Sequence, residues 1–199
     1  LDALAADEIL GAFLAAVRAH EINPLSAEHA LLFLEAAVSA RQRRSAAYFL
    51  QIAEQGGAEV PRTLRLYAEG HDTASDMIKG VATVLVDRGI RIENGRGLPD
   101  RVIGSAFFID SSGLLITNYH VISSEVDPEY EGYSRMYIRL GDSSSSRIPA
   151  RVVGWDKVLD LALIKAEIEP EYVFSLLGGI VPQVGETVLA IGSPGGLEK

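Results

Sequence analysis

The chain contains no cysteine among its 199 residues, so a disulfide framework and a thiolate metal site are both excluded. Long apolar runs are also missing, since no stretch approaches the roughly eighteen residues that a membrane-spanning helix needs. Cations are outnumbered by acids, and the formal net charge of −9 argues against nucleic acid or an anionic membrane surface as a partner. What remains is a chain with 48% apolar residues, long enough for one large domain or two smaller ones.

Residues 1–79 are expected to form a helical domain, because apolar residues recur there at helical spacing. The first helix should end before Pro24, since the residue that precedes a proline avoids the α region. Ser26 is a suitable N-cap for a second helix. The arginines at positions 41, 43 and 44 are expected at the carboxyl end of that helix, where cations interact favourably with the helix dipole. Further helices are expected over residues 45–54, after Pro61 and over residues 72–78.

Two interpretations of this helical domain remain open. A small bundle that docks on the following domain is favoured, and a peptide-binding or oligomerising surface is the alternative. Short alanine-rich helices suggest a tetratricopeptide-like pair, but the sequence shows no clean repeat. His20, His29 and His71 have no carboxylate at metal-ligand spacing and are interpreted as surface or capping residues.

Residues 80–199 are expected to form an antiparallel β-barrel, because short apolar runs alternate with turn residues throughout. Closing such strands into a barrel also removes exposed sheet edges. The fold class predicted for the whole chain is therefore α+β, with a helical bundle followed by the barrel. Residues 88–100, rich in glycine, are expected to form a long loop. Strands are expected over residues 81–87, 102–109, 114–116, 136–140, 148–155, 161–165 and 187–191.

The segment 123–134 is acidic and is expected to be a solvated loop. Its clustered oxygens could hold calcium, but the spacing of an EF-hand loop is absent. The solvated loop is therefore the favoured interpretation, and neither a metal nor an organic cofactor is expected.

Two residues carry chemistry if they act together. His120 follows an apolar strand, and a histidine held where a rigid strand ends has the fixed orientation that a general base needs. Alone, such a histidine is more often structural. Further along the chain, Asp160 stands at the head of another apolar run, where a lone acid could be no more than a polar cap. The interpretation therefore depends on the pair.

The segments around these two residues resemble a known family. Thr117-Asn-Tyr-His-Val-Ile and Asp160-Leu-Ala-Leu-Ile-Lys are similar to the histidine and aspartate motifs of trypsin-like serine proteases. The similarity is closest to the cysteine-free bacterial HtrA/Deg-like branch. Two more segments match that branch, Gly104-Ser-Ala-Phe-Phe-Ile-Asp and Val184-Gly-Glu-Thr-Val-Leu-Ala-Ile-Gly-Ser-Pro-Gly-Gly. The resemblance covers roughly residues 80–199 and implies the first barrel of a double-barrel fold.

The resemblance implies that His120 is the general base of a Ser-His-Asp triad and that Asp160 orients it. It also implies a nucleophilic serine in a Gly-Asn/Asp-Ser-Gly-Gly motif, which does not occur in these residues. Ser193 lies in Gly-Ser-Pro-Gly, which is neither that motif nor a hydrolase elbow. Ser105 is placed inside a strand, and Ser111 and Ser112 are placed in a turn. No serine of this chain is therefore nominated.

The resemblance thus implies the amino-terminal part of a serine endopeptidase whose serine lies in a second-barrel part outside this chain. The alternative is an inactive protease-like protein that serves in binding or adhesion, and the presence of both His120 and Asp160 favours the endopeptidase. The expected partners are the second-barrel fragment and protein or peptide substrates, with homo-oligomerisation left open. The expected location is the bacterial periplasm, the cell envelope or outside the cell. Lys199 follows a glycine-containing segment and is expected to be a nicking site.

Overall fold

The structure is a computed structural model that describes residues 15, 18, 26–70, 72–141, 146–176, 183–186 and 188–192. Contacts between Cα atoms divide the chain into two compact units. The first comprises Leu1–Thr73, Asp110–Ser112 and Val173–Leu189, and the second comprises Ala74–Ile109, Gly113–Tyr172 and Ala190–Lys199. The domain boundary expected between residues 79 and 80 stays a prediction.

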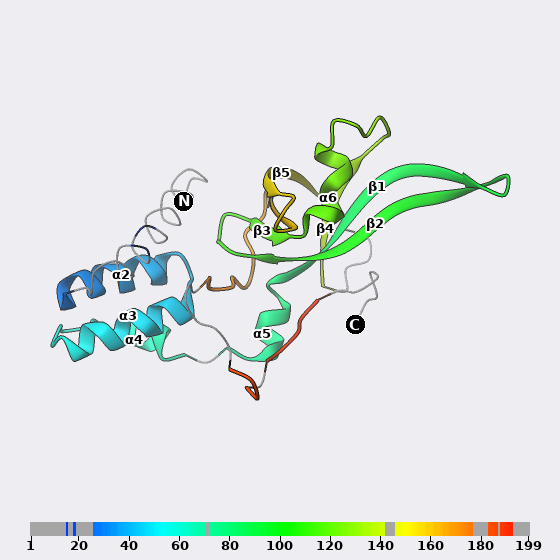
Figure 1. The fold of residues 1–199 in the computed structure, drawn as a ribbon. Coiled ribbons are helices and arrows are strands. Elements are labelled where there is room, and N and C mark those ends of the chain that lie inside the picture. The colour runs from blue at the N-terminus through cyan, green and yellow to red at the C-terminus, as the bar shows by residue number, and fades with distance from the viewer. Residues whose placement is uncertain are drawn as a thin grey trace. The chain divides into compact units, whose positions relative to one another are not determined.

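The first unit is helical, with α2 (Ala27–Ser39), α3 (Arg43–Gln55) and α4 (Arg62–Ala68). Ser26 is the N-cap of α2, as predicted, because its Oγ accepts a hydrogen bond from the His29 amide at 3.4 Å. α2 packs along α3 (Figure 1), and small side chains at their contact let the two backbones approach. The fully buried residues of these two helices include Ala30, Leu34, Ala37, Ala46, Phe49 and Ala53.

The arginine cluster differs from its prediction. α2 ends at Ser39, and Arg43 and Arg44 open α3 instead of closing α2, because the chain turns at Arg41 with φ of 57°. Arg43 is not simply solvated. Its Nε pairs with Asp72 Oδ1 at 2.9 Å, and its guanidinium lies 4.8 Å from the centroid of the Tyr67 ring.

Several predicted features of the first unit lie outside the described residues. They are the first helix with its end at Pro24, and the positions of His20 and His71. Among the helices that the structure does describe, none has the length and apolar character needed to cross a membrane.

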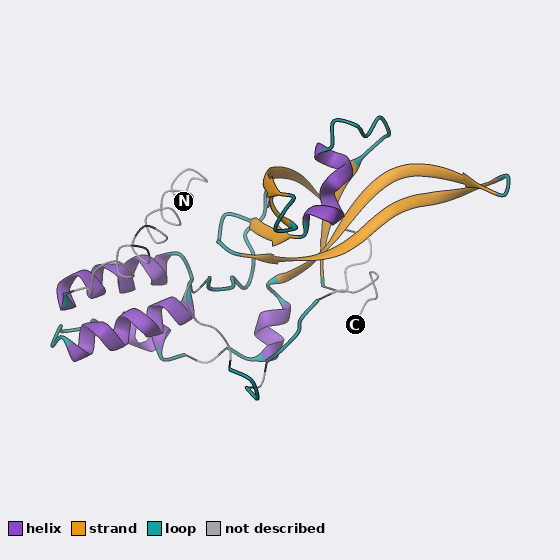
Figure 2. Cartoon of the chain, in the orientation of Figure 1, coloured by secondary structure: helices purple, strands orange, loops and turns teal. Residues whose placement is uncertain are grey.

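The second unit is a closed barrel of six antiparallel strands, as predicted (Figure 2). The strand order is β1-β2-β3-β6-β5-β4, and β4 pairs back onto β1 through Val84 and Ile138 among others. The core includes Phe108, Leu115, Ile122, Ile138 and Ile164, all fully buried. A short helix, α5 (Ala74–Ile78), precedes the barrel. The strands are β1 (Val81–Glu93), β2 (Arg96–Phe108), β3 (Leu114–Thr117), β4 (Arg135–Leu140), β5 (Ile148–Asp156) and β6 (Leu161–Ala166).

The expected long loop over residues 88–100 is wrong, because β1 and β2 continue through it as a hairpin (Figure 1). Asn94 and Gly95 have φ of 52° and 74°, and positive φ at both central residues is the requirement of a tight hairpin turn. Gly89, with φ of 84°, lies at the register shift between Asp87 and Ile90 and lets β1 bend without ending. Glycine here allows the strands to continue, whereas the sequence pattern predicts a break.

Two further expectations about the barrel region are wrong. Residues 119–126 form helix α6 (Tyr119–Val126), so His120 lies in the first turn of a helix and not at the end of a strand. The acidic loop begins only after this helix. Residues 188–192 are in no strand, and Thr187 lies outside the described residues. The six strands already close the ring without residues 188–191, since β4 pairs with β1.

Candidate active site

His120 and Asp160, far apart in the sequence, lie in contact in the structure. His120 Nδ1 is 2.8 Å from Asp160 Oδ2, and the His120 amide donates to Asp160 Oδ1 at 2.9 Å. The two residues come from the first turn of α6 and from the turn that precedes β6. The carboxylate therefore holds both the backbone and the ring of the histidine.

The pairing of β3 with β6 produces this contact. Thr117, the last residue of β3, is paired with Ala162, so the residues after β3 leave the sheet beside those that enter β6. The Thr117 hydroxyl also donates to the Ser105 carbonyl oxygen at 2.8 Å, which ties the end of β3 to β2. Antiparallel pairing at this register places Asn118 and His120 next to Asp160.

The contact indicates which ring nitrogen of a neutral His120 carries the proton. The carboxyl of Asp160 has its pKa held below its usual value of 3.8, chiefly by the hydrogen bond from the His120 amide and then by the bond to the His120 ring. A carboxylate can only accept hydrogen bonds, so the proton of a neutral His120 ring lies on Nδ1. Nε2 is then the basic nitrogen, and 67% of the His120 side-chain surface is exposed.

A glycine in β2 allows α6 to lie close to the sheet. A Cβ built on Gly104 would come within 2.6 Å of Val121 Cγ2, which is closer than such atoms approach in proteins. Val121 follows His120 directly and is buried in the barrel core. Gly104 therefore helps to set the position of the helix that carries His120.

The serines considered from the sequence lie in β2, in the turn before β3 and outside the described residues. Ser105 lies in β2, and its Oγ faces Gly192, with 3.1 Å to a Cβ built there. Ser112 lies in the turn before β3, where its hydroxyl donates to Asp110 Oδ2 at 2.7 Å. Ser193 lies outside the described residues. Ser123 lies on α6, and its hydroxyl donates to the backbone carbonyl oxygen of His120 at 3.3 Å and not to the ring.

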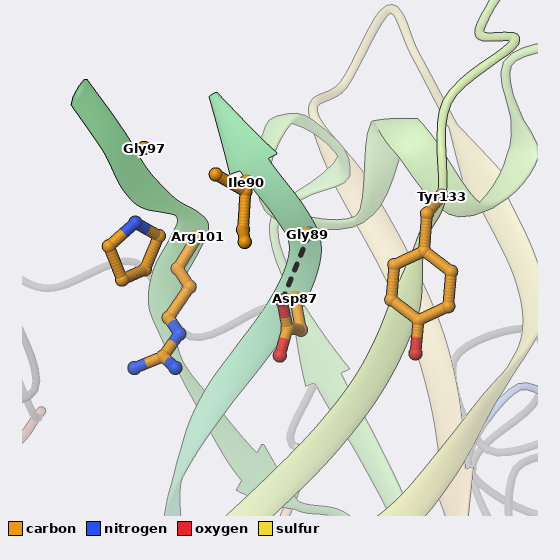
Figure 3. A pocket seen from close by; sticks show the side chains of 7 residues that line it. Asp87, Gly89, Ile90, Gly97, Arg101 and Tyr133 are labelled. Carbon is orange, nitrogen blue, oxygen red and sulfur yellow. Dashed lines mark hydrogen bonds between the residues drawn. The ribbon is translucent and has the colours of Figure 1, made fainter. Parts of the chain in front are cut away.

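The described residues of the barrel unit line at least two hollows. One, of about 440 Å³, lies between the β1–β2 hairpin and Tyr133 (Figure 3). Neither His120 nor Asp160 lines it, and its acid, Asp87, accepts a hydrogen bond from the Gly89 amide at 3.0 Å. The other, of about 230 Å³, adjoins the pair because Leu161 follows Asp160. It is mainly apolar and is lined by Ile116, Gly154, Trp155, Asp156, Leu161, Ala162 and Leu163.

Metal ligands do not converge in the part of the chain that the structure describes, where no group of three His, Cys, Asp or Glu side chains could hold an ion. Side-chain hydrogen bonds join residues of the acidic segment after α6 to one another and to the last turn of that helix. Ser134 Oγ contacts Glu125, and the Tyr130 hydroxyl donates to the Tyr133 carbonyl oxygen at 3.0 Å.

Comparison with known proteins covers this same half of the chain. Residues 104–199 match the family model of the trypsin-like peptidase domain. The resemblance to HtrA/Deg-like serine proteases is confirmed. The "Probable periplasmic serine endoprotease DegP-like" of Rickettsia conorii is 38% identical over 95 residues, covering 47% of this chain and 17% of that protein. The "Magnetosome formation protease MamE" of Paramagnetospirillum magneticum is 32% identical over 100 residues, covering 48% of this chain and 12% of that protein.

Among solved structures, the crystal structure of Deg5 is similar to this chain, with 27% sequence identity and a TM-score of 0.34. The match covers 47% of this chain and 40% of the Deg5 chain. The chain spans less than a quarter of the length of the two curated relatives named above. The family match begins at Gly104, so it includes both His120 and Asp160, and helices α2, α3, α4 and α5 lie outside it.

Proposed function

We propose that this chain is the part of a serine endopeptidase that supplies the general base and the residue that orients it. His120 is the base and Asp160 is the orienting acid of a Ser-His-Asp triad. The nucleophilic serine lies in a carboxyl-terminal part outside this chain. The observation that carries the proposal is the double contact of the Asp160 carboxylate with the His120 amide and ring, at 2.9 and 2.8 Å.

The proposed reaction depends on which nitrogen of the His120 ring carries the proton. Asp160 holds the ring proton on Nδ1, so Nε2 takes the proton of the serine hydroxyl as its oxygen attacks the scissile carbonyl carbon. The imidazolium that forms is stabilised by the adjacent carboxylate. His120 then returns the proton to the leaving amine, and a water molecule repeats the cycle on the acyl-enzyme.

The substrates proposed are proteins or peptides in the bacterial periplasm or cell envelope. The names of the relatives support the reaction class and the location, since they include a periplasmic endoprotease and a magnetosome-formation protease. Exposed apolar side chains beside Asp160 give an unfolded substrate or the second barrel a surface to bury, with Val158 exposed to 93% and Leu159 to 66%.

The test compares this chain with a longer one that continues into the segment following Lys199 in the natural protein. We expect the longer protein to cleave a fluorescently labelled unfolded protein and to react with a fluorophosphonate, and residues 1–199 alone to do neither. Asp160→Asn should reduce kcat by about 10⁴-fold, because the ring then loses its proper tautomer. Ser112→Ala is the matched control and should keep full activity.

The outcome also separates this function from the binding alternative. A longer protein that folds, binds unfolded polypeptide and neither cleaves it nor reacts with the fluorophosphonate is a protease-like binding protein. Mass spectrometry of native and denatured preparations tests the predicted nick. A second fragment with a Gly-x-Ser-Gly-Gly sequence supports two associated pieces, and a single species of residues 1–199 contradicts them.

A further inference from the structure

Asn118 occupies the N-cap position of α6 but does not cap it. Its backbone is extended, with φ of −87° and ψ of 147°, as an N-cap residue requires, and asparagine is among the preferred residue types there. An N-cap side chain normally accepts a hydrogen bond from an amide of the first turn. The Asn118 side chain makes no such bond.

The capping role is instead filled by Asp160. The amide that an N-cap residue would satisfy is that of His120, two residues further on, and it donates to Asp160 Oδ1 at 2.9 Å. The Asn118 side chain donates to Asp160 as well, from its Nδ2 to the Asp160 carbonyl oxygen at 3.0 Å. The Tyr119 amide reaches the same oxygen at 3.2 Å. The Asn118 side chain and the amides of Tyr119 and His120 thus all donate to Asp160.

Asp160 needs such a restraint because its backbone is unusual. Its φ is 53°, in the left-handed region that few residues other than glycine adopt, and its side-chain surface is 44% exposed. The turn before it leaves Val158 and Leu159 on the surface.

 Because these two neighbours are exposed at 93% and 66%, they give this peptide little packing support. Hydrogen bonds must therefore hold Asp160 in the conformation from which its carboxylate reaches both the amide and the ring of His120.

We propose that Asn118 is a positioning residue for the His120–Asp160 pair. Its side-chain amide holds the Asp160 carbonyl oxygen, and this keeps the backbone of Asp160 in the left-handed conformation that directs the carboxylate at His120. The role assigned to the pair rests on the proposed function, whereas the geometry of the restraint does not. Asn118 also adds, as the smallest contribution, to the groups that lower the pKa of the Asp160 carboxyl.

The test removes the donor without changing the shape of the side chain. Asn118→Asp has the same outline but no N–H group, and Asn118→Ala removes the whole amide. Ser123→Ala is the matched control, because Ser123 bonds to the His120 carbonyl oxygen on the same helix and leaves Asp160 untouched. Asn118 is exposed, so all three variants are expected to fold.

The direct readout is ¹⁵N NMR of the His120 ring in this chain, assigned by its absence in His120→Ala. In the unsubstituted chain and in Ser123→Ala, the proton of the neutral ring should lie on Nδ1 and give a ¹⁵N signal typical of a protonated ring nitrogen. In both Asn118 variants that signal should weaken, with the proton distributed between the two nitrogens. Folded Asn118 variants that retain the Nδ1 signal unchanged would overturn the proposal.

Cleavage by the longer protein is the second readout. Misplacing a catalytic group by about 1 Å can cost about 100-fold in rate, so kcat should fall by about 10- to 100-fold in the Asn118 variants, with KM little changed. If the NMR signal changes but neither His120→Ala nor Asp160→Asn alters cleavage, the proposed function fails and the positioning role stands. If those two substitutions abolish cleavage while the Asn118 variants keep both the signal and full activity, the positioning role fails alone.

Discussion

The contacts that stabilise the helical unit internally differ from those that stabilise the barrel. In the helical unit, α2, α3 and α4 follow one another in the chain and pack through alanines such as Ala37 and Ala46. In the barrel, β1 pairs with β4 and β3 pairs with β6, so strands distant in sequence must meet in one register. The candidate site lies in the barrel because such long-range pairing can bring together two side chains from distant segments. The contacts between successive helices stabilise the described part of the helical unit, but they do not bring candidate catalytic side chains together.

The two substitutions with the largest expected effect test whether the two units unfold separately. Phe108 in the barrel and Phe49 in the helical unit are both buried, and replacing either with alanine should cost about 3–5 kcal/mol. Trp155 is the single tryptophan and lies in β5, so its fluorescence reports on the barrel, while the helical signal in circular dichroism reports mainly on the helices. Phe108→Ala should shift the fluorescence transition, and Phe49→Ala should shift the helical one. Equal shifts of both probes in both variants would mean a single cooperative unit.

A second substitution tests how strongly the site depends on barrel packing. Gly104→Ala should cost about 1–3 kcal/mol, because its Cβ would collide with Val121 and displace α6. Gly154→Ala is the control, since a Cβ there meets nothing within 4 Å. Thermal unfolding measures the stability, and ¹⁵N NMR of His120 measures the displacement. A Gly104→Ala protein with an unchanged His120 spectrum would show that α6 is positioned by other contacts.

In the helical unit the comparison concerns charged contacts. Arg43 pairs with Asp72, whose side chain is only 11% exposed, and lies over Tyr67, so Arg43→Ala should cost about 1–2 kcal/mol. Arg65 pairs with Glu54 on the surface, and Arg65→Ala should cost less than about 1 kcal/mol. Urea denaturation followed by circular dichroism measures both. Equal losses would mean that the burial of Asp72 adds nothing to the Arg43 contact.

The smallest expected effect is a pH dependence that belongs to the barrel alone. The pKa of Asp160 is lower in the folded chain than its usual value of 3.8, so folding favours the ionised carboxyl. This stabilisation is present above pH 3.8 and is lost as the pH falls through the lower, folded value. The fluorescence transition of the unsubstituted protein should therefore weaken more on acidification than that of Asp160→Asn. Parallel curves for the two proteins would contradict the lowered pKa.

The sequence by itself determined the fold class, most of the strands and the two residues of the candidate site. Apolar alternation is a local property, so the strands around Ile138, Val152 and Ile164 could be placed within a residue or two. Ser26 could be identified as an N-cap for the same reason. His120 and Asp160 were found because their flanking motifs resemble those of a known family, and the geometry of their contact was not needed.

Only the tertiary structure decided how these parts meet. Gly89, Asn94 and Gly95 suggested a loop, yet cross-strand pairing turned them into the bend and tip of one hairpin. α6 is short and is capped by Asp160 from another segment, so its start had no complete local signal. The hydrogen bonds that Asp160 accepts from Asn118 and His120 depend on the register of β3 against β6. Hydrogen bonds between distant segments form only after the chain has closed the barrel, and a local pattern of residues cannot encode them alone.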